Sequence, residues 1–363
     1  MKNAPRYRVR WIVASDTDMY HSGKLATGLQ ELSRQGLMTV HTRAFAGPPP
    51  EPGTRRAVRW DVVDDESRRE ISLAIDLADS AARMDLLSAE ECDVYFKRSF
   101  VRTELESLAP PSTPCVFLPL GLNHSCMSGS ARTLLARAAG RRIQARLSIG
   151  HGAWESARGF LEDLRTMAGL PPPEAFENFE PGPRTGQVLF QTRVWPPEPS
   201  TDDLDALNHE RADLVRELRA AFPDAFVGGV VADAFSTAHF PDVVTRQSIH
   251  RSDYAAMTRR ALIGVYSRGI HHSLAFKLSE YLASGLCIVS SALPHELPEP
   301  LVPGRHYLPY QTAAECVSAV RWLQTHPDEA ARMQRDNIDY YKANVAPAPC
   351  VLSLLTRAFR ALD

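Results

Sequence analysis

Residues 263–290, IGVYSRGIHHSLAFKLSEYLASGLCIVS, indicate the fold more sharply than any other stretch of this chain. The run 261–266 is short and mostly apolar, which is typical of a buried parallel strand. A polar, glycine-containing loop, 267–273, follows, and apolar residues then recur at helical spacing. Gly285 stands where a helix C-terminus favours a left-handed residue, and a second apolar run begins after it. This order predicts a parallel α/β unit with an anion-binding loop at the end of a strand.

Two charged residues in this stretch point to function. Lys277 and Glu280 are three residues apart, so they share a face of the predicted helix. A solvent-exposed ion pair is the ordinary explanation for such a pair. Their position in the first turns after a strand-end loop favours contact with a ligand, because ligands of open α/β sheets bind at this edge.

The rest of the chain repeats the same alternation. Strands are expected at 8–15, 38–45, 71–75, 93–96, 115–120, 188–195 and 225–231, with helices between many of them. This alternation predicts doubly wound α/β architecture. The length of 363 residues favours two domains.

Composition and charge argue against several classes of function. The net charge is −2, so nothing global favours a nucleic-acid partner. No apolar run approaches the ~20 residues of a membrane span. The first residues contain no signal-peptide core, and the six cysteines form no Cys-x-x-Cys pair. We therefore expect a cytoplasmic protein with reduced thiols.

The segment 280–285, EYLASG, resembles the Glu-Ala-Met-Ala-x-Gly pattern of bacterial GT-B glycosyltransferases, specifically the retaining, glycogen-synthase-like clan. The resemblance covers most of 185–345. It implies two Rossmann-like, doubly wound α/β domains that face each other across a cleft. The expected boundaries are 1–170 for an acceptor-side domain, 171–186 for a linker, 187–345 for a nucleotide-sugar-binding domain, and 346–363 for a helix crossing back to the first domain.

The resemblance also implies a donor site in the second domain. Glu280 would hold the donor ribose, and Arg193 would bind the diphosphate. The family's usual lysine after that arginine is absent, and Lys277 is our candidate replacement. His272 stands where the family often has a second glutamate. The remaining predicted donor contacts are the loop and helix start formed by His271, His272, Ser273, Leu274 and Ala275.

Candidate residues of the first domain are His21, Gly23 and Asp79. The loop with His21 and Gly23 lies where GT-B enzymes bring a small glycine-containing loop toward the diphosphate. A retaining enzyme needs no protein base, whereas an inverting one would need Asp79 or His21. Asp16 and Asp18 form an Asp-x-Asp pattern, but they follow the first strand too soon for a metal site of the other glycosyltransferase fold.

The resemblance thus implies transfer of a hexose or related sugar from a nucleotide-diphosphate sugar to a small-molecule or glycan acceptor. No cofactor and no metal are expected. The alternative is a GT-B protein that binds a sugar nucleotide without transfer, either epimerase-like or phosphorylase-like or a degenerate binding subunit. Donor base, sugar, acceptor, linkage and oligomeric state all stay open.

One further pattern concerns partners. Arginines recur at helical spacing between Arg132 and Arg146, with pairs four apart at 137/141 and 142/146. Such a stripe is typical of a solvated helix face. Its functional alternative is contact with a membrane surface or another phosphate-rich partner.

Overall fold

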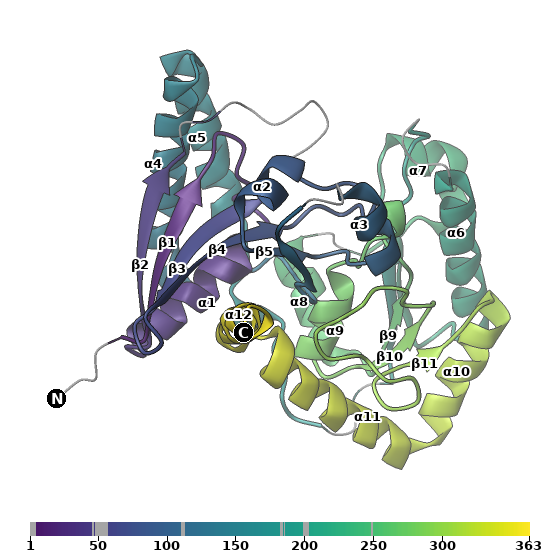
Figure 1. Cartoon of the computed structure of the whole chain (residues 1–363). Helices are drawn as coiled ribbons and strands as arrows, with labels where there is room; N and C mark the ends of the chain where they lie inside the picture. Colours follow the sequence, from purple (N-terminus) through teal and green to yellow (C-terminus); the bar gives the residue numbers. More distant parts are fainter. Residues whose placement is uncertain are drawn as a thin grey trace. The chain divides into compact units, whose positions relative to one another are not determined.

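The computed structural model describes residues 5–45, 47, 57–109, 113–181, 184, 186–198, 203–247 and 250–363. The chain divides into two compact units. Unit 1 comprises Met1–Pro173, His295–Glu299 and Ala343–Asp363, and unit 2 comprises Glu174–Pro294 and Pro300–Lys342. Each unit has a central β-sheet with helices packed on it, which confirms the predicted α/β class (Figure 1). The cleft expected between the domains stays a prediction.

The division at Pro173 falls within the expected linker 171–186. Residues 182, 183 and 185 of that segment lie outside the described residues. His295–Glu299 groups with unit 1, where the amide of Glu296 donates to the carbonyl of Phe100 at 3.0 Å. Sequence patterns gave no sign of this association, because it joins segments almost 200 residues apart.

Unit 1 is built on a six-stranded sheet in the order β2-β1-β3-β4-β5-β6. The strands are β1 Tyr7–Val13, β2 Met38–Ala44, β3 Val58–Asp64, β4 Arg69–Asp76, β5 Val94–Lys97 and β6 Val116–Pro119. All neighbours pair in parallel except β3, which is antiparallel to both β1 and β4. β3 is not among the strands predicted from the sequence, although its side chains alternate between buried and partly buried.

The helices of unit 1 are α1 Gly23–Arg34, α2 Leu86–Glu91, α3 Arg102–Leu108, α4 Arg132–Ser148, α5 Ala153–Ala168 and α12 Pro347–Ala361. The C-terminal α12 packs against α1, where a Cβ added to Gly28 would lie 2.3 Å from the Pro347 carbonyl oxygen. Arg357 of α12 donates to the Pro119 carbonyl at 2.7 Å. The last helix is therefore part of the core of unit 1.

Unit 2 has a five-stranded sheet, wholly parallel, in the order β11-β10-β9-β7-β8. Its strands are β7 Val188–Thr192, β8 Phe226–Val230, β9 Ile263–Tyr266, β10 Cys287–Ser290 and β11 Leu308–Pro309. Its helices are α6 Leu204–Ala221, α7 Ala234–His239, α8 Arg251–Arg260, α9 Lys277–Ala283, α10 Ala313–Thr325 and α11 Pro327–Tyr340. The strand order reverses between β7 and β9, and ligands of doubly wound sheets bind at the carboxyl ends of such a pair.

Two glycines fix α9 against the sheet. A Cβ on Gly264 of β9 would lie 2.6 Å from the ring of Tyr281, so only glycine lets the α9 tyrosine lie on the strand. The Tyr281 hydroxyl donates to the Val265 carbonyl at 3.3 Å. Gly285 has φ of +56°, which confirms the predicted left-handed stop of this helix. The first turn of α9 is thereby held beside the loop that follows β9.

Candidate functional site

The carboxyl ends of β7 and β9 gather cationic side chains. Arg193 directly follows β7, and its side chain is exposed. Ser267 and Arg268 directly follow β9. Because the crossover helices leave these two strands in opposite directions, the loops after them leave an opening at this edge of the sheet. This is where the sequence predicts the donor phosphates.

A buried arginine of α6 joins the two loops. The Arg211 guanidinium donates to the Arg193 carbonyl at 2.8 Å and to the Arg268 carbonyl at 2.6 Å. It also reaches the Ser267 hydroxyl at 3.3 Å. Burial lowers the pKa of Arg211 to about 10. The loops after β7 and β9 therefore share one hydrogen-bonding group.

The loop after β9 is also tied to the start of α6. Asp203 pairs with the Arg268 guanidinium at 2.5 Å and with His272 Nε2 at 3.2 Å. His271 and His272 both have positive φ, 53° and 55°, which is uncommon for residues other than glycine. The Ser273 amide closes the turn by donating to the Ile270 carbonyl at 3.0 Å.

The predicted helix start at 272–275 is wrong. Two consecutive left-handed residues cannot continue into a right-handed helix, and α9 begins only at Lys277. The amides of Ser273 and Ala275 donate within the chain, to the Ile270 carbonyl and to the Tyr266 hydroxyl at 2.9 Å. The segment His272–Ala275, including the buried Leu274, is thus a folded loop instead of an open helix N-terminus.

Lys277 is the first residue of α9 and is half-buried. No hydrogen bond or ion pair joins its amino group to another described residue. Burial lowers the pKa of Lys277 to about 7, and the charge of Arg211 is the next largest cause. Arg193 and Arg251 lower it further, while Glu280 opposes them. Cations therefore outnumber carboxylates around Lys277, which favours binding of an anion.

We expect a Lys277→Met variant of the ligand-free protein to be more stable than the wild type at pH 6. The folded-state pKa of about 7 lies below the ordinary lysine pKa of 10.5, so the charged lysine opposes folding most strongly below pH 7. The unfolded chain binds the extra proton between the two values. The advantage of the variant should therefore shrink as the pH rises from 7 and vanish above 10.5.

Urea unfolding at pH 6, 8 and 10 measures this difference. Lys342→Met is the matched control, because that exposed lysine lies over the Phe179 ring, 4.4 Å from its centre, away from the strand ends. A Lys277→Met advantage that is equal at all three pH values would contradict the lowered pKa.

Glu280 lies deeper than the sequence suggests. Its side chain is 1% exposed, and Oε1 accepts from the Arg251 guanidinium of α8. That guanidinium lies 4.9 Å from the centre of the Phe176 ring. Oε2 is buried and has no hydrogen-bond partner. Glu280 thus forms a buried pair with Arg251 and not the surface pair with Lys277 that was the ordinary alternative, and one carboxylate oxygen is left unpartnered.

The candidates of the first domain all lie in unit 1. His21 Nδ1 lies 2.5 Å from Asp18 Oδ2. Gly23 is the first residue of α1, and a Cβ there would lie 2.5 Å from the Cys126 carbonyl oxygen. This glycine therefore has a packing role within unit 1. Asp79, with its side chain 40% exposed, accepts a hydrogen bond from the Arg98 guanidinium.

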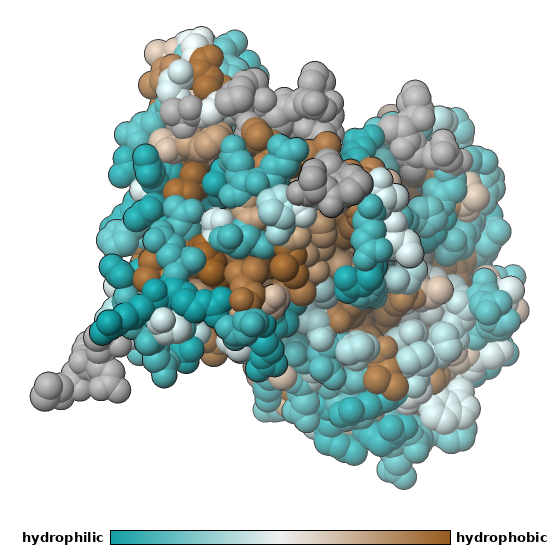
Figure 2. Space-filling view, viewed as in Figure 1, coloured by the Kyte–Doolittle hydropathy of each residue, from teal (hydrophilic) through white to brown (hydrophobic). Residues whose placement is uncertain are grey.

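The prediction that the α4 arginines form one exposed basic face is wrong. Arg142 and Arg146 turn inward, where both donate to the Ser15 carbonyl, at 2.9 and 3.1 Å. Arg142 also pairs with Asp163 of α5. Apolar groups gather at the free end of the α4–α5 hairpin instead (Figure 2, top left), where Trp154 is 82% exposed. No helix among the described residues is long and apolar enough to cross a membrane.

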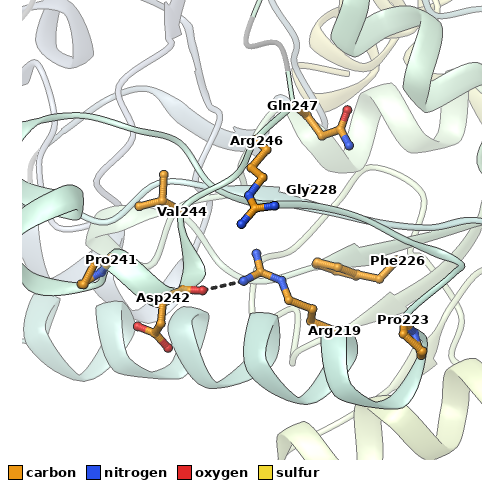
Figure 3. Close-up of a pocket in the computed structure, with 9 residues that line it drawn as sticks. All are labelled: Arg219, Pro223, Phe226, Gly228, Pro241, Asp242, Val244, Arg246 and Gln247. Atoms are coloured by element: carbon orange, nitrogen blue, oxygen red, sulfur yellow. Dashed lines mark hydrogen bonds between the residues drawn. The ribbon is translucent and has the colours of Figure 1, made fainter.

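A pocket of about 480 Å³ lies elsewhere on unit 2 (Figure 3). It is lined by Arg219, Pro223, Phe226, Gly228, Pro241, Asp242, Val244, Arg246 and Gln247. Arg219 donates to the Asp242 carbonyl at 2.5 Å, and the guanidinium of Arg246 lies in the same hollow. Phe226 and Gly228 belong to β8, the edge strand of the sheet, and the lining includes none of the residues that follow β7 and β9.

Three residues of this site, Arg211, Arg268 and Asp203, were not predicted from the sequence. The spacing of apolar residues in α6 could have identified Arg211 as buried. Arg211 lies four residues after Leu207 and seven after Leu204, which places an arginine within the buried stripe of α6. A charged residue at a core position of an amphipathic helix indicates a buried polar contact.

Comparison with known protein families gives a match over most of unit 2. A family model described as glycosyl transferase-like matches residues 211–344, almost entirely within unit 2. The match confirms the predicted resemblance to glycosyltransferases. No curated protein matches the sequence.

Solved structures show weak likeness over most of the chain. Sucrose-phosphate synthase from Thermosynechococcus elongatus is 12% identical, with 93% of this chain and 92% of that chain covered and a TM-score of 0.39. HepE from Anabaena, solved in complex with UDP, is 8% identical, with 97% and 99% covered and a TM-score of 0.39. A putative UDP-N-acetylglucosamine 2-epimerase from Listeria monocytogenes is 9% identical, with 99% and 95% covered and a TM-score of 0.37. Values this low carry no ligand or activity over to this chain.

Proposed function

We propose that this protein is a glycosyltransferase that moves a sugar from a nucleotide-diphosphate donor to a small-molecule or glycan acceptor. The observation that carries the proposal is the excess of cationic side chains at the carboxyl ends of β7 and β9. Arg193, Arg211 and Lys277 contribute to it, and all three lie in unit 2. The glycosyl transferase-like family match covers Arg211 and Lys277.

The chemistry of transfer explains why such a site needs positive charge. The bond from the anomeric carbon to the β-phosphate oxygen breaks, and the electron pair leaves with the diphosphate. A new bond forms between that carbon and the acceptor heteroatom, whose proton passes to the departing diphosphate where no protein base takes it. Preorganised cations stabilise the charge that develops on the leaving group. We assign this role to Arg193 and to Lys277, which has no other partner among the described residues.

Glu280 is the proposed ribose contact. A buried carboxylate oxygen without a hydrogen-bond donor is costly. Donor hydroxyls would satisfy Oε2, provided that the Arg251 side chain, which is 35% exposed, turns away to open the site. His271, His272, Ser273, Leu274 and Ala275 would shape the loop around the donor rather than present a row of free amides.

We further propose that the reaction is retaining and needs no protein base. If it inverts, His21 is a better candidate than Asp79. Asp18 holds one nitrogen of the His21 ring, and an imidazole oriented by a carboxylate is a recurring form of general base. Asp79 is instead occupied by the Arg98 guanidinium.

A protein that binds a sugar nucleotide without transferring the sugar is the second candidate function. Two observations favour it: His272 replaces the acidic residue of the resembled motif, and Glu280 is closed off by Arg251. Release of free sugar or of an epimerised nucleotide, without an acceptor product, would identify this class.

A thermal-shift panel of UDP, GDP, dTDP, ADP and their common sugar conjugates tests the proposal. A diphosphate present at a hundred times its Kd should stabilise the protein by about 2.7 kcal/mol. Lys277→Met should abolish the shift and Lys342→Met should keep it. If no nucleoside diphosphate stabilises the wild type, the proposed function is wrong.

We predict that transfer activity survives EDTA. The described residues contain no group of three or more His, Cys, Asp or Glu side chains placed to hold a metal ion. The diphosphate charge is assigned to Arg193 and Lys277, so no bridging cation is needed. The measurement is the initial rate with and without chelator. Loss of activity that Mg²⁺ or Mn²⁺ restores would contradict this prediction and bring back Asp16 and Asp18 as candidate ligands.

A further inference from the structure

Arg211 is the most connected charged group at the strand ends of unit 2. Arg211 is only 5% exposed, although it lies on α6, an 18-residue helix whose other face is solvated. Its three hydrogen bonds reach two different loops, through the Arg193 carbonyl on one side and through Ser267 and the Arg268 carbonyl on the other. A planar guanidinium suits this task, because its donors point in fixed directions.

The partners of Arg211 are all neutral oxygens. None of its hydrogen bonds is made to a carboxylate, and no ion pair joins it to another described residue. The nearby Asp203 is occupied by Arg268 and His272. A buried cation without a counter-ion is expensive. No neutral side chain carries donors on three nitrogens, so a bridge to both loops requires this cation, and its charge also acts on Lys277.

We propose that Arg211 is a positioning residue of the donor site: it fixes the loop after β7 against the loop after β9 and thereby aims Arg193 at the bound diphosphate. The inference rests on the proposed function. It gives Arg211 no contact with the reacting atoms. Arg211 acts by two routes. The first is its hydrogen bond to the Arg193 backbone, and the second is its repulsion of the positive charge on Lys277.

The second route follows from the surroundings of Lys277. Arg211 on α6 and Arg193 after β7 both lower the pKa of Lys277, as does Arg251 on α8, while Glu280 on α9 raises it. Arg211 is the largest of these charges in effect, after burial. Removing its charge should therefore let Lys277 stay protonated to higher pH.

Two variants separate the two routes. Arg211→Lys keeps the charge but loses the planar fork, whereas Arg211→Gln loses both. The first measurement is hydrogen exchange of the ligand-free full chain. Both variants should exchange about tenfold faster than the wild type at residues 193–198 and 267–273, because lost hydrogen bonds of this kind are worth about a factor of ten. Amides within β7 and β9 should not change.

The second measurement is the pH dependence of inorganic pyrophosphate affinity. Wild-type affinity should fall as the pH rises through about 7. Arg211→Lys should keep this midpoint, and Arg211→Gln should move it to higher pH. Pyrophosphate itself changes protonation over this pH range, but it does so equally in all three experiments. Differences between the three pH midpoints therefore come from the proteins.

Unchanged exchange in both loops, with melting temperatures near that of the wild type, would overturn the positioning role. If the Gln variant does not fold, the Lys variant decides, since it too lacks the fork. If pyrophosphate binds no variant and not the wild type, the proposed function fails, whereas the exchange result still decides whether Arg211 orders the two loops. A pH midpoint that is equal in all three proteins would overturn the route through Lys277.

Discussion

An Arg193→Ala variant is expected to fold normally and to lose about 10²–10³-fold in kcat. The side chain is exposed and makes no hydrogen bond or ion pair with a described residue, so its loss costs the fold little. The backbone carbonyl that Arg211 holds is kept in the variant. What disappears is a positive charge whose effect is greatest as the diphosphate leaves. Transition-state stabilisation is therefore lost more than ground-state binding, and kcat should fall more than KM rises.

Steady-state kinetics together with melting temperatures test this expectation. Arg246→Ala is the matched control, because Arg246 is another exposed arginine of unit 2 but lines a pocket that includes none of the residues following β7 and β9. If Arg193→Ala leaves kcat and KM near wild type, Arg193 has no catalytic role. Equal losses in both variants would indicate a general effect of surface charge instead of a site.

The fold could be predicted where local pattern decides it. Residues 263–290 contain a buried strand, an amphipathic helix and a glycine stop, and each is fixed by residues close in sequence. β3 illustrates the limit. Its alternating side chains were available in the sequence, but its antiparallel direction depends on pairing with β1 and β4, which no local spacing encodes.

The candidate site likewise has features that local sequence predicts and features that depend on tertiary packing. The positions of Arg193 and Lys277 at strand ends follow from the alternation of strands and helices. The start of α9 does not, because it depends on the left-handed backbone of His271 and His272, residues that seldom adopt that conformation. The pairing of Glu280 with Arg251 depends on how α8 packs beside α9, which is tertiary information.

The burial of Glu280 leads to a prediction about stability. Glu280→Ala should lower the free energy of unfolding by about 2–3 kcal/mol, since it removes a charged hydrogen bond inside the protein. The cost stays at the lower end for a buried pair because Arg251 is 35% exposed and can turn to solvent. Glu280→Gln, which preserves shape, should cost less. Glu217→Ala, an exposed position on α6, is the control. Urea unfolding of the ligand-free chain would contradict us if Glu280→Ala and Glu217→Ala were equally stable.

The same residue gives the sharpest test of how a donor would bind. Glu280→Gln should weaken UDP, or whichever nucleoside diphosphate proves to bind, by about 10–100-fold, the range expected for losing charged hydrogen bonds to hydroxyls. Inorganic pyrophosphate has no ribose, so its affinity should fall much less than that of UDP, only by as much as Glu280 supports the charge of Lys277. Lys277→Met should weaken both ligands, because it removes charge that faces the phosphates. Calorimetry with the two ligands therefore separates the ribose contact from the phosphate contact. An equal loss for UDP and pyrophosphate in Glu280→Gln would show that Glu280 acts only through the shape of the site, by holding Arg251, and not through the donor sugar.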